Sequence, residues 1–415
     1  MQNLKQRVKG LLIWSQKYTQ TDMVYLAKGG FWLTLGQVIS TLASFLLAIA
    51  FANLLPKETY GTYKYILSLV GILGIFALPG IGTAVTQAAA RGLEGSFYTG
   101  FKAKLRWGLL GSLAAVGLAG YYFFKGNYAL PIPLLISAIF LPLMQASGVY
   151  GSFLTGRKLF NIQVKYSSLS QVISIGAMIA ALFLTKNLFW LIAVYFVSHT
   201  FLNYFFYLLT KKKFQPNKKE DPETLSYGKR LSPLWVIGIV ANQVDKILFF
   251  HFLGPIQLAI YSFALAPVEQ AQSLFKSLGL LSLPKLSQRT IPELKKTLFT
   301  KILKSCLILI PIIGLYIFLA PYLYHLVFPQ YTSSIIYSQV FVLSLLFGPK
   351  VLLGQTLFAH KKERELYMQS FIISGSKILL LAIFLPIYGI WGAISALLAT
   401  EVISFIVLTI MFKKL

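Results

Sequence analysis

The sequence predicts an all-α integral membrane protein of twelve transmembrane helices, arranged as two six-helix lobes with the N- and C-termini in the cytoplasm. Of the 415 residues, 56% are hydrophobic and only 12% are charged, and the mean hydropathy is +0.70, which excludes a soluble globular protein. The hydrophobic residues form separate runs of about 18 residues or more, each long enough for a helix that crosses a bilayer. The basic residues gather in alternate loops between these runs, as the positive-inside rule requires.

The apolar runs can be followed along the chain in order. They predict spans at 29–52, 62–88, 107–124, 130–154, 166–184, 188–209, 231–253, 257–283, 302–323, 334–358, 368–386 and 389–412. The predicted outside loops hold only three basic residues, Lys57, Lys125 and Lys186. This asymmetry places both termini in the cytoplasm. It also explains the net charge of +26 as a topology signal, so no nucleic-acid partner is expected.

The longest inside loop, at 210–230, divides the spans six and six, and it predicts a linker between an N-lobe at 29–209 and a C-lobe at 231–415. Ahead of the first span, residues 1–28 are polar and basic and show no cleavable signal peptide. Leucine and valine side chains share one helical face there, which favours an interfacial helix on the cytoplasmic surface. A solvated basic tail is the alternative.

The two predicted lobes resemble repeats. In both, an apolar span ends in a short outside turn and the next span begins near a tyrosine. One constant shift without a gap aligns Leu55 with Leu253, Gly61 with Ala259, Tyr63 with Tyr261, and Arg91 with Arg289. Paired six-helix halves with the substrate between them are an architecture that transporters use.

Two local signals concern helix geometry. Pro79 removes one backbone hydrogen bond from the second span, and the adjacent Gly80 tolerates distortion, so this span is predicted to bend. A bend would serve alternating access, although proline and glycine are also generally common in transmembrane helices. Ser232 and Pro233 predict the cap and the first turn of the span at 231–253.

Five charged side chains lie well inside predicted spans of the C-lobe. They are Asp245 and Lys246 in the seventh span, Glu269 in the eighth, Lys377 in the eleventh and Glu401 in the twelfth. A charge at the bilayer centre costs about 2.5–3.5 kcal/mol on insertion scales, so such residues normally face a bundle interior or a watery cavity. We therefore predict that they line a functional cavity. Closed structural ion pairs are the alternative.

Helical spacing predicts how the charges of the seventh span are oriented. Asn242, Asp245 and Phe249 share one face, and Lys246 lies beside that face. We therefore expect that Asp245 and Lys246 do not face one another and that each has a partner elsewhere.

The balance of these charges predicts ion coupling. Lys377 can neutralise Glu401 or Asp245, but three acids against two lysines leave one acid unpaired. Asp245, Glu269 and Glu401 are the candidates for binding a proton or a sodium ion. No other cofactor and no metal site are expected, because Cys306 is the single cysteine and the four histidines lack zinc-ligand spacing.

The polar residues of the N-lobe are mostly uncharged, and we interpret them as contacts between packed helices. Lys64, near the start of the second span, and Arg91, at its other end, are the cations expected to contact a phosphate. The outside loops are short and contain one acid, Glu58. They leave no room for a catalytic loop, so no catalytic residue is predicted.

Two short motifs carry a resemblance to a known family. The stretch FANLLPKETYGTY at 51–63 resembles the turn after the first span in polysaccharide flippases of the Wzx type. QVDKIL at 243–248, followed by LGP at 253–255 and AIYSFA at 259–264, resembles the seventh-to-eighth helix signature of the same family. Ala259 departs from that signature, which usually has a glycine before the tyrosine.

The resemblance implies a member of the multidrug/oligosaccharidyl-lipid/polysaccharide exporter superfamily. Such a protein carries undecaprenyl-diphosphate-linked oligosaccharide from the inner to the outer leaflet of the bacterial cytoplasmic membrane, beside glycosyltransferases and a polysaccharide polymerase as partners. Lys246, Lys377, Lys64, Arg91 and Asn242 are then the candidates for contacting the diphosphate and the glycan, because lysines meet phosphates as point charges.

Two alternatives remain from the sequence. A multidrug antiporter of the same superfamily would export cations and would need an acidic cavity, against which Lys246 and Lys377 argue. A membrane-bound glycosyl or acyl transferase would need catalytic residues in an outside loop, and the sequence contains no such loop.

Overall fold

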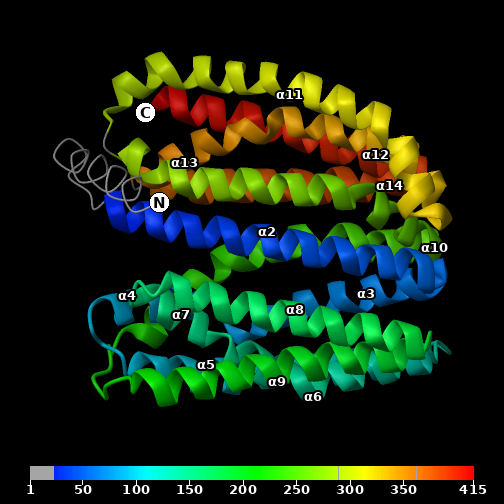
Figure 1. Cartoon of the computed structure of the whole chain (residues 1–415), viewed down its shortest axis with the longest axis horizontal. Helices are drawn as coiled ribbons and strands as arrows, with labels where there is room; N and C mark the ends of the chain where they lie inside the picture. Colours follow the sequence, from blue (N-terminus) through cyan, green and yellow to red (C-terminus); the bar gives the residue numbers. More distant parts are fainter. Residues whose placement is uncertain (1–22, 288, 361) are drawn as a thin grey trace, which may run out of the picture.

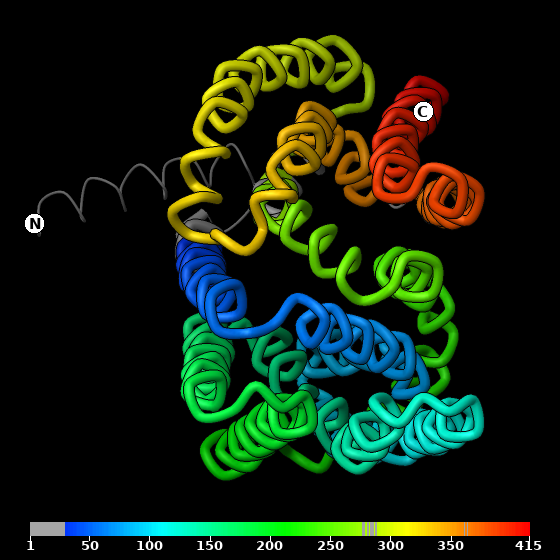
Figure 2. The backbone as a smooth tube through the Cα atoms, turned by 90° about the vertical axis from the view of Figure 1, so that its right-hand side faces the viewer, coloured from blue at the N-terminus to red at the C-terminus, as the bar shows by residue number. Residues whose placement is uncertain are grey.

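The computed structural model describes residues 23–287, 289–360 and 362–415, and within these residues the regular secondary structure is entirely helical. The helices run roughly along one long axis, with the start of α2 and the C-terminus at the same end (Figure 1). Seen along that axis, the helices of the first and second halves of the chain lie in two groups (Figure 2). The predicted all-α membrane fold is confirmed. The side of the membrane on which the termini lie stays a prediction.

The first group is built from the first half of the chain. Its elements are α2 (Met23–Leu54), α3 (Lys57–Leu73), η1 (Gly74–Ala77), α4 (Gly80–Ala90), α5 (Ser96–Phe124), α6 (Pro131–Ser147), α7 (Val149–Gly156), α8 (Phe160–Leu184) and α9 (Leu188–Phe214). The predicted interfacial segment at 1–28 lies outside the described residues up to residue 22, and α2 begins at Met23.

The second group follows after a short connection. Its elements are α10 (Thr224–Ser287), α11 (Ile291–Val327), η2 (Pro329–Ser334), α12 (Ile335–Phe341), η3 (Val342–Lys350), α13 (Val351–Ala359) and α14 (Glu363–Lys414). The boundary between a first lobe at 29–209 and a second at 231–415 stays a prediction.

Ten helices in the described part of the chain are long and apolar enough to cross a membrane. Two of these stretches, Thr224–Phe275 and Arg364–Lys414, have 52 and 51 residues, which is about twice the length that one crossing needs. Each contains a glycine with non-helical backbone, Gly254 (φ 80, ψ 177) and Gly389 (φ 58, ψ −135). These glycines lie where the sequence predicted turns. The total of twelve crossings stays a prediction.

The predicted bend in the second span is present as a break. α3 ends at Leu73, η1 follows, and Leu78 adopts a left-handed conformation (φ 52, ψ 76) before α4 begins at Gly80. A Cβ on Gly80 would lie 2.4 Å from the Gly228 carbonyl oxygen, so glycine is needed for α4 to touch α10. The break therefore brings the two groups of helices into direct contact at this end.

The predicted helix cap at Ser232 is wrong. α10 begins eight residues earlier, at Thr224, and Ser232 lies inside it. Its hydroxyl donates to the Gly228 carbonyl at 2.8 Å and accepts from the Gly80 amide at 3.2 Å. Ser232 therefore joins α10 to α4, because the polar run before residue 231 is helical rather than part of the linker.

At the opposite end of the bundle, which the sequence predicts to face outward and which we call the outer end, the two turns aligned by the repeat lie against each other. A Cβ on Gly61 would approach the Pro255 carbonyl oxygen to 1.8 Å, so only glycine fits there. Tyr63 and Tyr261, which the repeat aligns, are both buried. The two turns are therefore packed closely against each other at this end.

The non-helical connection between α9 and α10 spans residues 215–223 and is shorter than the predicted linker at 210–230. It is bound to the α4–α5 connection, where the Gly95 amide donates to the Lys219 carbonyl at 2.8 Å and the Asp221 amide donates to the Ser96 hydroxyl at 3.0 Å. These bonds hold the connection against the first group of helices.

Candidate functional site

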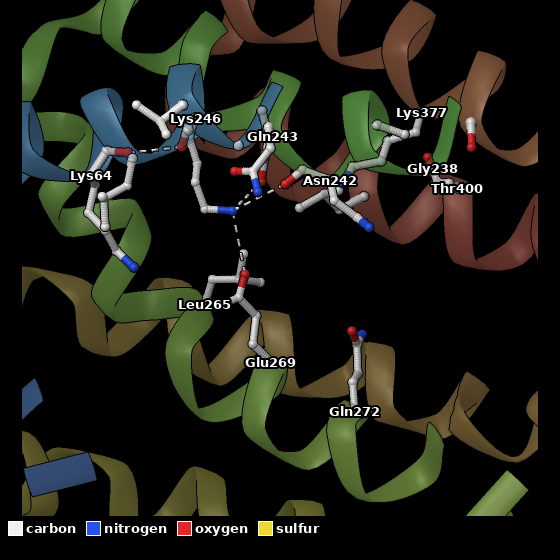
Figure 3. A pocket seen from close by; sticks show the side chains of 18 of the residues that line it. Lys64, Gly238, Asn242, Gln243, Lys246, Leu265, Glu269, Gln272, Lys377 and Thr400 are labelled. Carbon is white, nitrogen blue, oxygen red and sulfur yellow. Dashed lines mark hydrogen bonds and ion pairs between the residues drawn. The ribbon is translucent and has the colours of Figure 1, made fainter. Parts of the chain in front are cut away.

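A cavity of about 740 Å³ lies between the two groups of helices. The polar and charged side chains that line it come from α3, α6, α9, α10, η3 and α14, and they are Lys64, Ser68, Gln145, Tyr195, Asn242, Gln243, Asp245, Lys246, Glu269, Gln272, Ser344, Ser374, Lys377, Thr400 and Glu401. All the predicted site residues except Arg91 are among them. Figure 3 shows Lys64, Lys246, Glu269 and Lys377 among the lining residues. The first half of the chain contributes one charge, Lys64, and α10 and α14 contribute the others.

The centre of the cavity is a three-residue ion cluster on α10. The Lys246 ammonium lies 3.6 Å from Asp245 Oδ2 and 3.6 Å from Glu269 Oε1. The Tyr261 hydroxyl donates to Asp245 Oδ2 at 2.6 Å. Because Glu269 and Tyr261 follow the Gly254 turn, the cluster joins the two segments of α10.

The prediction that Asp245 and Lys246 do not face one another is wrong. Their backbone positions are on different faces of α10, but a lysine side chain is long and tilts toward the N-terminus of its helix. Lys246 follows this direction, since its ammonium also donates to the Asn242 carbonyl at 3.4 Å. Helical spacing therefore predicts the direction of the Asp245 and Lys246 Cβ atoms but not the position of the Lys246 ammonium.

A second ion pair lies at the α14 end of the cavity. Glu401 pairs with Lys350, the last residue of η3, and both side chains are largely buried. Of the two acids considered as partners of Lys377, Glu401 thus pairs with Lys350 instead. Lys350 lies in the predicted span at 334–358, but the sequence does not show that it reaches Glu401, because that contact depends on how separate helices pack.

The remaining cavity lysines have no carboxylate partner. Lys64 and Lys377 line the cavity, and neither forms an ion pair with an acid in the described part of the chain. Lys64 instead lies 5.8 Å from the centre of the Tyr60 ring. Three lysines and three acids line the cavity, and Lys350, which is not among the lining residues, pairs with Glu401. With Glu401 neutralised in this way, Lys64, Lys246 and Lys377 face two acids, Asp245 and Glu269, so the unmatched charge is positive. Each acid has an ion-pair partner, in contrast to the expectation of an unpaired acid.

Arg91 does not reach this cavity. It is the residue after α4, it pairs with Asp221 of the connection to α10, and 60% of its side chain is exposed. It lines a separate pocket of about 450 Å³, where the neighbouring Gln87 amide donates to the Tyr227 hydroxyl at 3.2 Å. The structure thus separates Arg91 from Lys64, which the sequence analysis had grouped as cations for one phosphate.

Solved transporters share this fold. The structure superposes on an inward-facing multidrug resistance MATE family transporter of the MOP superfamily with a TM-score of 0.71 and 12% identity, over 90% of this chain and 94% of that chain. It superposes on the lipid II flippase MurJ, in an inward closed conformation, with a TM-score of 0.69 and 18% identity, over 92% and 87%. An outward-facing MATE transporter gives 0.62 and 13%, over 94% and 95%. The chain therefore has the same fold as these solved proteins.

The family follows from the sequence itself. Residues 26–289, more than half of the chain, match the family described as polysaccharide biosynthesis protein, and the chain belongs to that family. A comparison with curated proteins finds no match. The predicted relationship to a polysaccharide family is confirmed, and the chain shares the fold of the MATE transporter and of MurJ.

Proposed function

We propose that the protein is a flippase that carries undecaprenyl-diphosphate-linked oligosaccharide from the cytoplasmic to the outer leaflet of the bacterial cytoplasmic membrane by alternating access. The observation that carries this proposal is the positive excess of the cavity, where Lys64 and Lys377 lack carboxylate partners among the described residues. A diphosphate supplies the missing negative charge and accepts charge-assisted hydrogen bonds from ammonium groups.

The size and lining of the cavity suit the head of such a substrate. A volume of about 740 Å³ lies in the range of sites for small polar molecules. Hydroxyl and amide side chains such as Ser68, Gln145, Gln272 and Thr400 offer partners for sugar hydroxyls. The cavity has no space for a long polyprenyl tail, which would stay in the bilayer while the head crosses.

The membrane potential favours transport in this direction. Moving two negative charges outward across about 100 mV, negative inside, releases roughly 4.6 kcal/mol. Coupling to a proton or a sodium ion would add to this. Asp245 is the best supported of the predicted coupling residues Asp245, Glu269 and Glu401, because its Oδ1 atom is buried with no hydrogen-bond partner in the described structure.

The conformation fits the start of the cycle. The higher TM-score against the inward-facing MATE transporter than against the outward-facing one supports an inward arrangement. The tight contact between Gly61 and Pro255 at the outer end agrees with this reading. Loading from the cytoplasmic leaflet would follow, where glycosyltransferases assemble the substrate, and a polysaccharide polymerase would use it on the other side.

The multidrug antiporter is the weaker alternative, because export of cations would require net negative charge in the cavity. The proposal is tested by export of the glycan in cells that depend on this protein, with Lys64→Gln and Lys377→Gln variants. We expect each to lower export about ten-fold or more, since each removes a charged contact to phosphate.

Lys125→Gln is the matched control, because Lys125 is exposed directly after α5 and is not among the residues that line the cavity. It removes the same charge and should export normally. Normal export by the Lys64→Gln Lys377→Gln double variant would contradict the proposed function.

A further inference from the structure

The two carboxylates that contact Lys246 differ in burial and in hydrogen bonding. Asp245 is 2% exposed and accepts a hydrogen bond from the Tyr261 hydroxyl. If the Asp245 carboxylate moved away from Lys246, the buried Tyr261 hydroxyl would lose its acceptor and the buried carboxylate would lose its counter-charge. The Glu269 side chain is 47% exposed, and Lys246 is its one ion-pair partner among the described residues. Asp245 is therefore the fixed partner and Glu269 the exchangeable one.

Glu269 lies on the side from which a cavity ligand would approach Lys246. In Figure 3 the Lys246 side chain extends from α10 into the open space and meets Glu269 there, with Lys64 and Lys377 on opposite sides of it. An anion drawn in by these two lysines would repel the Glu269 carboxylate and compete with it for the Lys246 ammonium. Asp245, on the buried side, would keep its contact.

We propose that Glu269 is a placeholder anion for the diphosphate: it binds Lys246 while the cavity is empty, and the substrate displaces it. This inference rests on the proposed function, and it gives Glu269 a role in specificity. An anion displaces Glu269 only if it binds the Lys246 ammonium more strongly than the half-exposed Glu269 carboxylate does. A diphosphate, with more charge and more acceptor oxygens, meets that condition more readily than a carboxylate ligand.

Displacement also has a structural consequence. Lys246 and Glu269 lie on the two segments of α10 that meet at Gly254, and their ion pair is a direct link between these segments. Once the diphosphate binds Lys246, the Lys246–Glu269 ion pair is broken, and the segment after Gly254 is less restrained relative to the segment before it. Substrate binding is thereby connected to a movement between the two segments.

The test is binding of farnesyl diphosphate to the purified full chain in detergent, measured by calorimetry. Glu269→Gln should bind the probe about five-fold more tightly, because a competing ion pair is removed. Lys246→Gln should bind it about ten-fold more weakly. The double variant Glu269→Gln Lys246→Gln should bind no more tightly than Lys246→Gln alone.

The Glu269→Gln Lys246→Gln double variant distinguishes exchange of anions at Lys246 from a general effect of cavity charge on diphosphate affinity. Neutralising an acid tightens anion binding everywhere in the cavity, and that effect would persist without Lys246. Glu269→Asp keeps the charge and should stay close to the wild type in affinity, and thermal unfolding of each variant confirms that it is folded.

The outcomes are distinct. Equal affinities of wild type and Glu269→Gln, or the same tightening with and without Lys246, would overturn the exchange and leave the proposed function standing. Absence of saturable binding by the wild type and by every variant would overturn both.

Discussion

The cavity contains two ion groups that look alike in composition and differ in enclosure. In the Asp245–Lys246–Glu269 cluster, one acid is 2% exposed and the other has a side chain 47% exposed. In the Lys350–Glu401 pair, the two side chains are 16% and 25% exposed, and each is the other's ion-pair partner within the described residues. A largely buried ion pair holds helices together, whereas a cluster in which one acid is exposed can exchange that acid for another anion. The difference indicates that the α10 cluster can exchange partners and that the Lys350–Glu401 pair is structural.

The largest expected effect is at the centre of the α10 cluster. Lys246→Ala removes the cation shared by both acids and leaves Asp245 buried without a counter-charge, so we expect glycan export to fall about a hundred-fold or more. The amount of protein inserted in the membrane should stay close to the wild-type level, as measured by immunoblot of membrane fractions. Lys301→Ala, at an exposed position of α11, is the control. Near-normal export by Lys246→Ala would remove the functional distinction between the two ion groups.

Charge reversal tests whether the second group is only structural. Glu401→Lys should lower the unfolding free energy by about 3 kcal/mol, because it leaves two largely buried cations side by side. The swapped pair Lys350→Glu Glu401→Lys should recover most of that stability and most of the export, as measured by thermal unfolding and by the cellular assay.

The same swap in the α10 cluster should behave differently. Lys246→Glu Glu269→Lys keeps the pair but places a glutamate beside Asp245, so export should not recover. If both swaps recovered export equally, the two ion groups would be functionally equivalent, contrary to the comparison.

A smaller effect is expected from the hydrogen bond that holds Asp245. Tyr261→Phe removes the donor at 2.6 Å from Asp245 Oδ2 and should cost about 1–2 kcal/mol of stability, with a several-fold loss of export. Tyr331→Phe is a matched control, because Tyr331 is equally buried and its hydroxyl has no partner among the described residues. Equal losses of stability in the two variants would show that the hydroxyl of Tyr261 does not fix the carboxylate.

Much of the fold and part of the site were predictable from the sequence. Long apolar runs, the turns near Gly254 and Gly389, and the break beside Gly80 were all visible, because the lipid environment requires apolar helices and because glycine and proline mark the interruptions. The charges Asp245, Lys246, Glu269, Lys377 and Glu401 were also visible, since charged residues in apolar spans are rare.

The partners of those charges were not predictable. The sequence did not reveal Lys350 as the partner of Glu401, nor that Arg91 lines a different pocket from Lys64. Such contacts depend on how helices distant in sequence are rotated and on where long side chains extend. The sequence by itself determined that this is a helical membrane protein with costly charges in its second half, because composition and hydropathy act locally along the chain. Only the tertiary structure decided that Glu401 is closed off by Lys350, that Asp245 is fixed and Glu269 exposed, and that the unmatched charge of the cavity is positive. Those properties follow from distances between side chains of different helical segments, which the packing of the bundle sets.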